Sequence, residues 1–275
     1  MSLAGVSARD ALDSAEVALS AAGVDTPRLD AEVLLAYDLG IDRPRLAVDR
    51  ERPVEGPAVR AFQDAVRRRA VEREPVAYIT GMRGFRRIDV GVDPRVLIPR
   101  PETEELVEAA LELPTRARVV EVGTGSGAVA LALKDERGDL EVLATDVSEG
   151  ALAVARANAT RLGLAVRFLH ADLLEGVPGA DAVLSNPPYV EDGTALEPEI
   201  ARHEPAGALF AGPDGLAVIR RLAAQAGRSP ARLLALEVGI GQAPAVAVLV
   251  RDAGFDAVEI RRDLAGIERV VIGRR

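Results

Sequence analysis

Four consecutive residues, Asn186-Pro187-Pro188-Tyr189, place an amide, two prolines and an aromatic ring directly after the apolar run "AVLS". The run predicts a buried strand, and the prolines end it because proline cannot donate a backbone hydrogen bond to a neighbouring strand. The Asn186 side-chain oxygen and the Pro187 carbonyl could accept both hydrogens of an N–H₂ group, while the Tyr189 ring packs against a flat amide or base. Such a loop suits a site for a planar nitrogen nucleophile; a proline-stiffened turn is the alternative.

A glycine-rich stretch, "EVGTGSGAV", lies between an apolar strand and a helix and contains Gly123, Gly125 and Gly127. Glycine lets the backbone turn sharply and lets a ligand approach it closely. Open α/β sheets bind ligands at the carboxyl ends of their strands, which is where this stretch falls. Its G-x-G-x-G spacing is neither the dinucleotide fingerprint nor a phosphate-binding loop with its lysine. The loop predicts a nucleotide-like cofactor, and a tight structural turn is the alternative.

Two aspartates follow later strands of the same pattern. Asp146 ends the strand "LATDV", where a carboxylate can accept hydrogen bonds from both hydroxyls of a ribose. Asp172 follows the strand "VRFLH" and could meet an adenine amino group. Each could instead be a helix-capping or solvated loop acid. Together with the glycines they favour an adenosine-type ligand, without deciding between a nicotinamide dinucleotide and S-adenosylmethionine.

Three segments differ in their patterns. Residues 1–74 contain helical stretches with capping signals such as Ser7 and Thr26-Pro27, which predict a small helical domain. Residues 75–100 have glycine breaks and short alternating apolar pairs, which predict a β-hairpin linker. Residues 101–275 alternate apolar strands and helices, which predicts an α/β domain with a mostly parallel sheet and an antiparallel edge formed by the last two strands.

In this topology the strand before the glycine loop neighbours the strand before Asn186, so the two loops should face each other. Methyl transfer from a sulfonium is an in-line displacement whose rate depends mainly on positioning. An amide or exocyclic nitrogen is a poor nucleophile, and acceptors on both its hydrogens would aim it and favour the transition state. The glycine loop, Asp146 and Asn186 together therefore predict methylation of an amino or amide nitrogen.

The composition excludes several classes of protein. The 275 residues are 48% hydrophobic, contain no cysteine and carry a formal charge of −9. Disulfides, thiolate zinc sites and, with only two histidines, a histidine-rich metal site are not expected. The beginning "MSLAGVSARD" lacks the basic and apolar blocks of a secretory signal, and no apolar run has the length of a membrane span. A cytoplasmic, monomeric protein without direct nucleic-acid contact is expected, and the basic run 66–73 is interpreted as a solvated helix face.

The sequence resembles the bacterial release-factor glutamine methyltransferases, which belong to the seven-stranded, Rossmann-like, S-adenosylmethionine-dependent methyltransferases. The motif N-P-P-Y alone is shared with adenine-N6 DNA methyltransferases and some RNA guanine methyltransferases. The segments that resemble the family follow one another in order. They are "LIPRPETEELVE", "EVGTGSGAVALAL", "ATDVSEGALAVARANA", "SNPPYV", "RHEPAGALFAGPDGL", "LEVGIGQ" and "DLAGIERVV".

The resemblance implies a methyl transfer from S-adenosylmethionine to the side-chain amide of the glutamine in the Gly-Gly-Gln loop of class I peptide-chain release factors. The N-terminal domain would help to dock that partner. The residues expected to bind the cofactor are Gly123, Thr124, Gly125, Ser126, Gly127, Asp146, Asp172, Leu173 and Asn186. The expected catalytic residues are Asn186, Pro187 and Tyr189, and Pro188 and Arg100 are expected to join them in binding the substrate.

The resemblance carries one departure and two expectations about supporting residues. Glu121 stands where many relatives have aspartate, so its contact with the cofactor is expected to be shifted or water-mediated. Pro101, Glu102 and Thr103 are expected to line the cleft. Glu204 and Pro205 are expected to brace the loop that follows Asn186.

Three other functions remain as alternatives. An adenine-N6 or other exocyclic-amine nucleic-acid methyltransferase would share the N-P-P-Y chemistry, but the acidic charge and the absence of a basic domain argue against it. A nucleotide-binding regulator without catalysis would not need Asn186. A hydride-transfer dehydrogenase is disfavoured by the glycine spacing.

Overall fold

The computed structural model describes residues 6–275, so the first five residues of the predicted N-terminal domain lie outside the described part. Contacts divide the chain into two compact units. The smaller unit contains the N-terminal segment to Gly81 together with Leu196–His203. The larger unit contains Met82–Ala195 and Glu204–Arg275.

The larger unit is built on a seven-stranded sheet with the strand order β10-β11-β9-β8-β5-β6-β7. The strands are β5 (Arg118–Val122), β6 (Glu141–Asp146), β7 (Arg167–His170), β8 (Ala182–Ser185), β9 (Leu233–Glu237), β10 (Ala257–Arg262) and β11 (Glu268–Arg274). Neighbouring strands from β9 to β7 are parallel, whereas β11 runs antiparallel to both β9 and β10. This arrangement confirms the predicted mostly parallel sheet with an antiparallel C-terminal edge.

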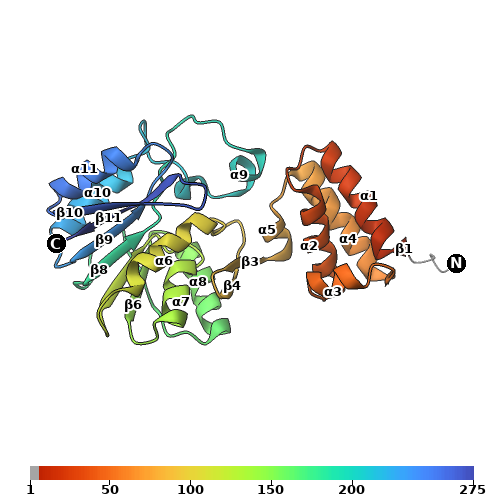
Figure 1. The fold of residues 1–275 in the computed structure, drawn as a ribbon, viewed down its shortest axis with the longest axis horizontal. Helices are drawn as coiled ribbons and strands as arrows, with labels where there is room; N and C mark the ends of the chain where they lie inside the picture. Colours follow the sequence, from red (N-terminus) through yellow and green to blue (C-terminus); the bar gives the residue numbers. More distant parts are fainter. Residues whose placement is uncertain (1–5) are drawn as a thin grey trace. The chain divides into compact units, whose positions relative to one another are not determined.

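The helices of the larger unit connect these strands and cover both faces of the sheet (Figure 1). They are α6 (Glu104–Leu111), α7 (Ala128–Glu136), α8 (Glu149–Leu162), α10 (Ala217–Gly227) and α11 (Ala243–Asp252). From β5 the chain passes through α7 to β6 and through α8 to β7, toward one edge of the sheet. From β8 it passes through α10 to β9, toward the other edge. Because such crossovers are right-handed, α7 and α8 cover one face and α10 the other. Strands β8 and β9 are buried along their whole length, as expected of central parallel strands.

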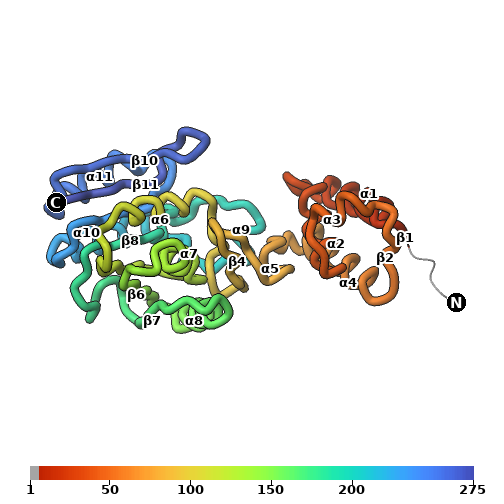
Figure 2. Tube along the Cα trace, turned by 60° about the horizontal axis from the view of Figure 1, so that its bottom comes forward, coloured from red at the N-terminus to blue at the C-terminus, as the bar shows by residue number. Residues whose placement is uncertain are grey.

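The smaller unit is a helical bundle, which Figure 2 shows as a tube trace. Its elements are β1 (Val6–Ser7), α1 (Ala8–Ala21), α2 (Pro27–Leu39), α3 (Arg43–Val48), β2 (Pro53–Val54), α4 (Pro57–Arg67), η1 (Arg68–Glu72), α5 (Val76–Thr80) and α9 (Pro198–His203). Ser7 caps α1 by accepting a hydrogen bond from the Asp10 N–H, and Pro27 begins α2. Across residues 6–275, none of the helices has both the length and the apolar character required to cross a membrane.

The basic run at residues 66–73 is a solvated helix face only in part, because Arg67 is exposed on α4 whereas Arg69 is buried. Helix α4 ends at Arg67, and a π-helical turn, η1, follows. Arg69 is only 8% exposed; it binds Asp30 at 2.7 Å and Glu199 of α9 at 2.8 Å. Arg73 also contacts Glu199, at 2.6 Å. A buried arginine needs such carboxylate partners, and here they tie α9 into the bundle although it lies far along the chain.

The predicted linker, residues 75–100, is a β-hairpin only in part. Residues 76–80 are helical (α5), and the hairpin itself consists of β3 (Met82–Phe85) and β4 (Ile88–Gly91). Residues 101–103 form a single 3₁₀ turn, η2 (Pro101–Thr103), before α6. The roles predicted for the segments that divide at residues 74 and 100 remain predictions. The first boundary between the two compact units follows Gly81.

Asn158 of α8 joins the hairpin to the glycine loop. Its side-chain oxygen accepts a hydrogen bond from the Gly91 N–H at 2.7 Å. Its amide nitrogen donates to the carbonyls of Gly91 and Ser126, each at 2.9 Å. Asn158 is 3% exposed and Ser126 is 2% exposed, so the bond between them is shielded from water, and the bonds to Gly91 are partly shielded. One buried amide therefore fixes two segments that border the candidate site.

Replacing Asn158 by alanine should destabilise the larger unit by about 2–4 kcal/mol, because it removes three hydrogen bonds and leaves the buried Ser126 carbonyl without this partner. The free energy of unfolding from urea titration would measure this loss. Thr160→Ala, an exposed change on the same helix, is the matched control. An Asn158→Ala protein that is as stable as this control would contradict the bridging role.

Candidate active site

A cavity of about 530 Å³ lies at the carboxyl ends of β5, β6 and β8. This is the edge where an open α/β sheet binds ligands. The predicted residues on its wall are Gly123, Thr124, Gly125, Ser126, Asp146, Asp172, Leu173, Asn186, Pro187 and Pro188. The parallel pairing of β5 with both β6 and β8 brings these separated segments together. Tyr189, Arg100 and Gly127 are not among the lining residues.

Part of the cavity wall comes from residues whose role the sequence did not indicate. They are Arg95, Val96, Leu97 and Pro99 before α6, and Gly207, Ala208, Val218 and Arg221 after the N-P-P-Y loop. Thr103 also lines the cavity, as expected, whereas Pro101 and Glu102, which were expected beside it, do not. Pro205, which was expected to brace the loop, lines the cavity as well. Apolar side chains from the linker therefore form part of the cavity wall, which suits the flat face of an adenine or an amide.

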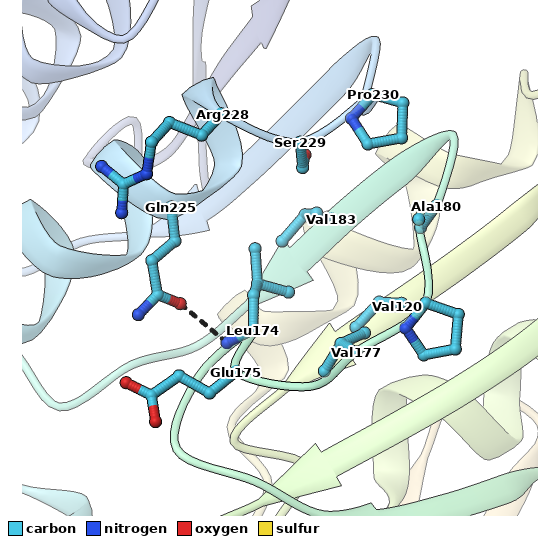
Figure 3. A pocket seen from close by; sticks show the side chains of 12 residues that line it. Val120, Leu174, Glu175, Val177, Ala180, Val183, Gln225, Arg228, Ser229 and Pro230 are labelled. Atoms are coloured by element: carbon cyan, nitrogen blue, oxygen red, sulfur yellow. Dashed lines mark hydrogen bonds between the residues drawn. The ribbon is translucent and has the colours of Figure 1, made fainter.

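A second cavity, of about 440 Å³, lies beside the beginnings of β8 and β9 (Figure 3). Val183, Leu174 and Val177 surround its centre, and the charged ends of Glu175 and Arg228 extend away from it. Its labelled polar contact, from the Leu174 N–H to the Gln225 side-chain oxygen, joins two parts of the wall at 2.8 Å. Because converging polar groups mark functional cavities, the first cavity is the candidate active site.

The glycine loop has backbone conformations that favour glycine. Gly123, Gly125 and Gly127 have φ angles of +73°, +54° and +84°. A Cβ atom on Gly127 would lie 3.1 Å from the Leu131 side chain and 3.2 Å from that of Ala155, so this glycine lets α7 pack against α8. Nothing lies within 4 Å of a Cβ atom built on Gly125. Gly127 is therefore required by packing, whereas Gly125 leaves open space beside the backbone.

Asp146 fixes the glycine loop at the end of β6. One carboxylate oxygen accepts the Gly125 N–H at 2.9 Å, and the other accepts the Ser148 N–H at 2.9 Å. Each oxygen has a second lone pair, which stays available to ligand hydroxyls on the cavity side. This geometry fits a carboxylate that binds both hydroxyls of a ribose.

Glu121 lies beneath the loop and is 4% exposed. One of its carboxyl oxygens accepts hydrogen bonds from the Thr124 hydroxyl at 2.6 Å and the Ala130 N–H at 3.0 Å. Burial nevertheless raises the pKa of Glu121 to about 8. The longer glutamate thus reaches back to the loop and the start of α7, while the residue also borders the cavity.

Glu121→Gln should reduce the loss of stability that the wild type shows at alkaline pH. An acid whose pKa is raised in the folded state keeps a proton that the unfolded chain releases, so stability falls as the pH rises from the ordinary value of 4.5 to about 8. Glutamine can accept the same two hydrogen bonds without ionising. Between pH 6 and pH 9, the melting temperature should therefore fall less in the variant than in the wild type. Equal drops would show that Glu121 does not titrate in this range.

Asp172 and Leu173 continue the wall after β7. Asp172 forms an ion pair with Arg221 at 2.6 Å, and both residues line the cavity. Leu173 has a φ of +57°, unusual for a residue with a side chain, and its carbonyl accepts a hydrogen bond from the buried Thr145 hydroxyl at 3.4 Å. The structure thus places both residues where the sequence predicted them, with Asp172 already paired.

Asn186 follows the last residue of β8 and lines the cavity next to the glycine loop, because a Cβ atom on Gly123 would lie 4.0 Å from the Asn186 carbonyl oxygen. Its amide nitrogen donates to the Thr103 hydroxyl at 3.1 Å. The side-chain oxygen is the other end of the same planar group, so it remains to accept a hydrogen bond from a ligand. Ser185 supports the turn from below, because its hydroxyl donates to the Val122 carbonyl of β5 at 2.7 Å.

Tyr189 is the last residue of the N-P-P-Y loop and does not line the cavity. Its hydroxyl is 3.4 Å from a carboxyl oxygen of Glu237, the last residue of β9. Its carbonyl accepts a hydrogen bond from the Gln242 side chain at 3.0 Å, and a Cβ atom on Gly215 would lie 2.3 Å from that carbonyl. The motifs "LEVGIGQ" and "GPDGL" therefore hold the loop in place. Packing of the Tyr189 ring against a substrate stays a prediction.

Arg100 is held away from the cavity by Glu204. The two side chains form an ion pair at 2.6 Å, and the Glu204 carboxyl group is almost completely buried. Burial raises the pKa of Glu204, although Arg100 opposes this effect. The contact agrees with the expected bracing role of Glu204. Binding of the substrate by Arg100 remains a prediction.

The cavity fits an adenosine-type cofactor on its structure alone. A carboxylate, Asp146, has spare acceptor capacity beside open space at Gly125, and apolar side chains line the same cavity. Its volume lies within the usual range of about 300–1,000 Å³ for small-molecule sites. A carboxylate acceptor for ribose hydroxyls and an apolar surface for a flat base are the groups expected of a nucleoside site.

Comparisons with known proteins give the family. The family model described as the PrmC N-terminal domain matches residues 10–81, and the methyltransferase small domain matches residues 102–204. The release factor glutamine methyltransferase of Mycolicibacterium smegmatis is 43% identical over 97% of both chains. A protein-(glutamine-N5) methyltransferase (release factor-specific) from Alicyclobacillus acidocaldarius is 34% identical and covers 67% of this chain and 98% of its own, with a TM-score of 0.42.

A more distant solved structure shares the fold alone. The hMettl16 catalytic domain in complex with MAT2A 3′UTR hairpin 1 has a TM-score of 0.56 at 12% identity, covering 88% of this chain and 91% of its own. The Mycolicibacterium relative, in contrast, matches 97% of the chain. Because this identity of 43% extends over 97% of both proteins, the chain belongs to the release factor glutamine methyltransferase family.

Proposed function

We propose that this protein transfers a methyl group from S-adenosylmethionine to the side-chain amide nitrogen of the glutamine in the Gly-Gly-Gln loop of class I release factors. The observation that carries the proposal is the arrangement across one cavity. Asn186 follows β8, the glycine loop follows β5, and Asp146, which holds that loop, ends β6. Strand β5 pairs with both β6 and β8, so all three strand ends meet at the cavity. Family membership supports the choice of a protein glutamine over a base.

When bound, S-adenosylmethionine supplies an electrophilic methyl group on a positively charged sulfur. Asp146 would hold the ribose hydroxyls, and Leu173 and the linker wall would cover the adenine. The Asn186 side-chain oxygen and the Pro187 carbonyl would accept the two hydrogens of the glutamine amide. These contacts aim the nitrogen along the line of displacement and stabilise the positive charge that develops on it. The nitrogen then loses one of its hydrogens as a proton, because alkylation makes it acidic.

The expected partner is a release factor, which the helical unit would help to dock. The acidic chain is not expected to bind nucleic acid directly. We expect a monomer that works in the cytoplasm, where release factors act in translation.

Mass spectrometry of the Gly-Gly-Gln peptide tests the proposed function. The protein would be incubated with S-adenosylmethionine and a purified class I release factor, and the peptide should gain one methyl group on glutamine. Duplex DNA and structured RNA under the same conditions serve as the competing substrates. Methylation of nucleic acid but not of the release factor would favour the exocyclic-amine alternative and overturn the proposal.

A further inference from the structure

A buried carboxyl group, Glu237, lies behind Asn186 and is not explained by the proposed mechanism. Glu237 ends β9, is 1% exposed, and is reached by two hydroxyl groups. The Tyr189 hydroxyl lies 3.4 Å from one carboxyl oxygen, and the Thr103 hydroxyl faces the same group. The other carboxyl oxygen is buried and has no hydrogen-bond partner among the described residues. An acceptor without a partner is costly when buried, so this carboxyl group requires a donor.

Thr103 connects this carboxyl group with Asn186. Its hydroxyl accepts the N–H of the Asn186 side chain at 3.1 Å, and it has a single hydrogen of its own to donate. When that hydrogen points to Glu237, the oxygen lone pairs of Thr103 face Asn186. The amide nitrogen of Asn186 must then turn toward Thr103, and its oxygen turns away. The direction of one hydroxyl hydrogen thus decides which end of the amide is offered to a ligand.

We propose that Thr103 and Glu237 are positioning residues: Glu237 accepts the Thr103 hydrogen, and Thr103 in turn holds the Asn186 amide with its oxygen toward the substrate nitrogen. This inference rests on the proposed function. A flipped amide would present N–H to N–H₂, which repels the substrate. Thr103 and Glu237 touch neither the substrate nor the cofactor in this scheme, and they act only through Asn186.

The protonation state of Glu237 should control this relay. Burial raises the pKa of Glu237 to about 7; the nearby Glu102 also raises it, while Thr103, Tyr189 and Arg269 lower it. The ionised carboxylate can only accept hydrogen bonds. The protonated acid can donate to Thr103 and reverse the relay. The turnover rate at saturating cofactor should therefore fall as the pH drops below about 7.

Substitution of Thr103 tests the first half of the inference. Thr103→Val removes the hydroxyl with little change in volume and should lower kcat for glutamine methylation by about tenfold or more. The Kd for S-adenosylmethionine should stay within about twofold of the wild-type value. Thr103→Ser should restore most of the lost rate, and Thr115→Val, at an exposed threonine before β5, is the matched control. An unchanged kcat in Thr103→Val would overturn the inference.

Substitution of Glu237 tests the second half through the pH profile. Glu237→Gln cannot ionise, so its kcat should be independent of pH between about 6 and 8, whichever way its amide is turned. The buried Glu121 remains in both proteins, so any titration of that group is shared. An acidic fall in kcat that persists unchanged in Glu237→Gln would overturn the inference. If the wild type does not methylate the release factor at all, the proposed function fails. An active wild type together with a fully active Thr103→Val, or with an unchanged acidic fall of kcat in Glu237→Gln, overturns this inference alone.

Discussion

Replacing Asn186 by alanine should lower the rate of glutamine methylation by about 100- to 1,000-fold, the usual effect of removing one preorganised polar contact to a transition state. Asn186 is the side chain in the cavity whose amide oxygen remains free after its nitrogen binds Thr103. Alanine removes that acceptor and leaves the Pro187 carbonyl alone to orient the substrate amide. A correctly aimed nitrogen would then be a rare conformation.

Single-turnover kinetics with a release factor and saturating S-adenosylmethionine would measure the loss directly. Glu191→Ala is the matched control, because Glu191 is exposed on the same loop and does not line the cavity. The cofactor Kd of Asn186→Ala should change much less than its rate. A variant that keeps more than a tenth of the wild-type rate would contradict the role assigned to Asn186.

Replacing Asp146 by alanine should weaken binding of S-adenosylmethionine by at least about 100-fold. The carboxylate holds the Gly125 and Ser148 N–H groups and would accept both ribose hydroxyls. Hydrogen bonds to a charged group contribute about 1.5–3 kcal/mol each, and 1.4 kcal/mol corresponds to a factor of ten. Loss of two such bonds, together with loosening of the loop at Gly125, gives the expected effect.

Isothermal titration calorimetry with S-adenosylmethionine would provide the Kd values. Asp252→Ala, at an exposed aspartate at the end of α11, should bind as the wild type does and controls for the change in charge. The far-UV circular dichroism of Asp146→Ala should match that of the control. Affinity within about fivefold of the wild type would exclude Asp146 as the ribose-binding group.

Several features of the site could be predicted because they are local in the sequence. Strand-ending prolines, closely spaced glycines and acids after apolar runs each mark a strand's carboxyl end. Once the strands were taken as parallel, their ends had to meet at one edge, which is why Asp146, Asp172 and Asn186 were expected together. The structure places all three on one cavity.

Other features depend on contacts between distant segments, which no short pattern contains. Arg69 belongs to a charged run that resembles a solvated face, yet Asp30 and Glu199, far from it in sequence, enclose it. Asn158 reads as an ordinary helical residue until the hairpin and the glycine loop close around it.

The sequence by itself determined the order of the elements, the chemistry of the N-P-P-Y and glycine loops, and the strand ends that carry them, because hydrophobic periodicity and proline or glycine geometry act over a few residues. Only the tertiary structure decided which residues from other segments support these two loops. Thr103 meets Asn186 through a hydrogen bond between distant segments, and Glu237 ends β9, the strand paired with β8; burial of Thr103 and Glu237 removes the water that would otherwise satisfy their polar atoms. Hydrogen bonds between such residues follow from packing, and packing is a property of the whole sheet.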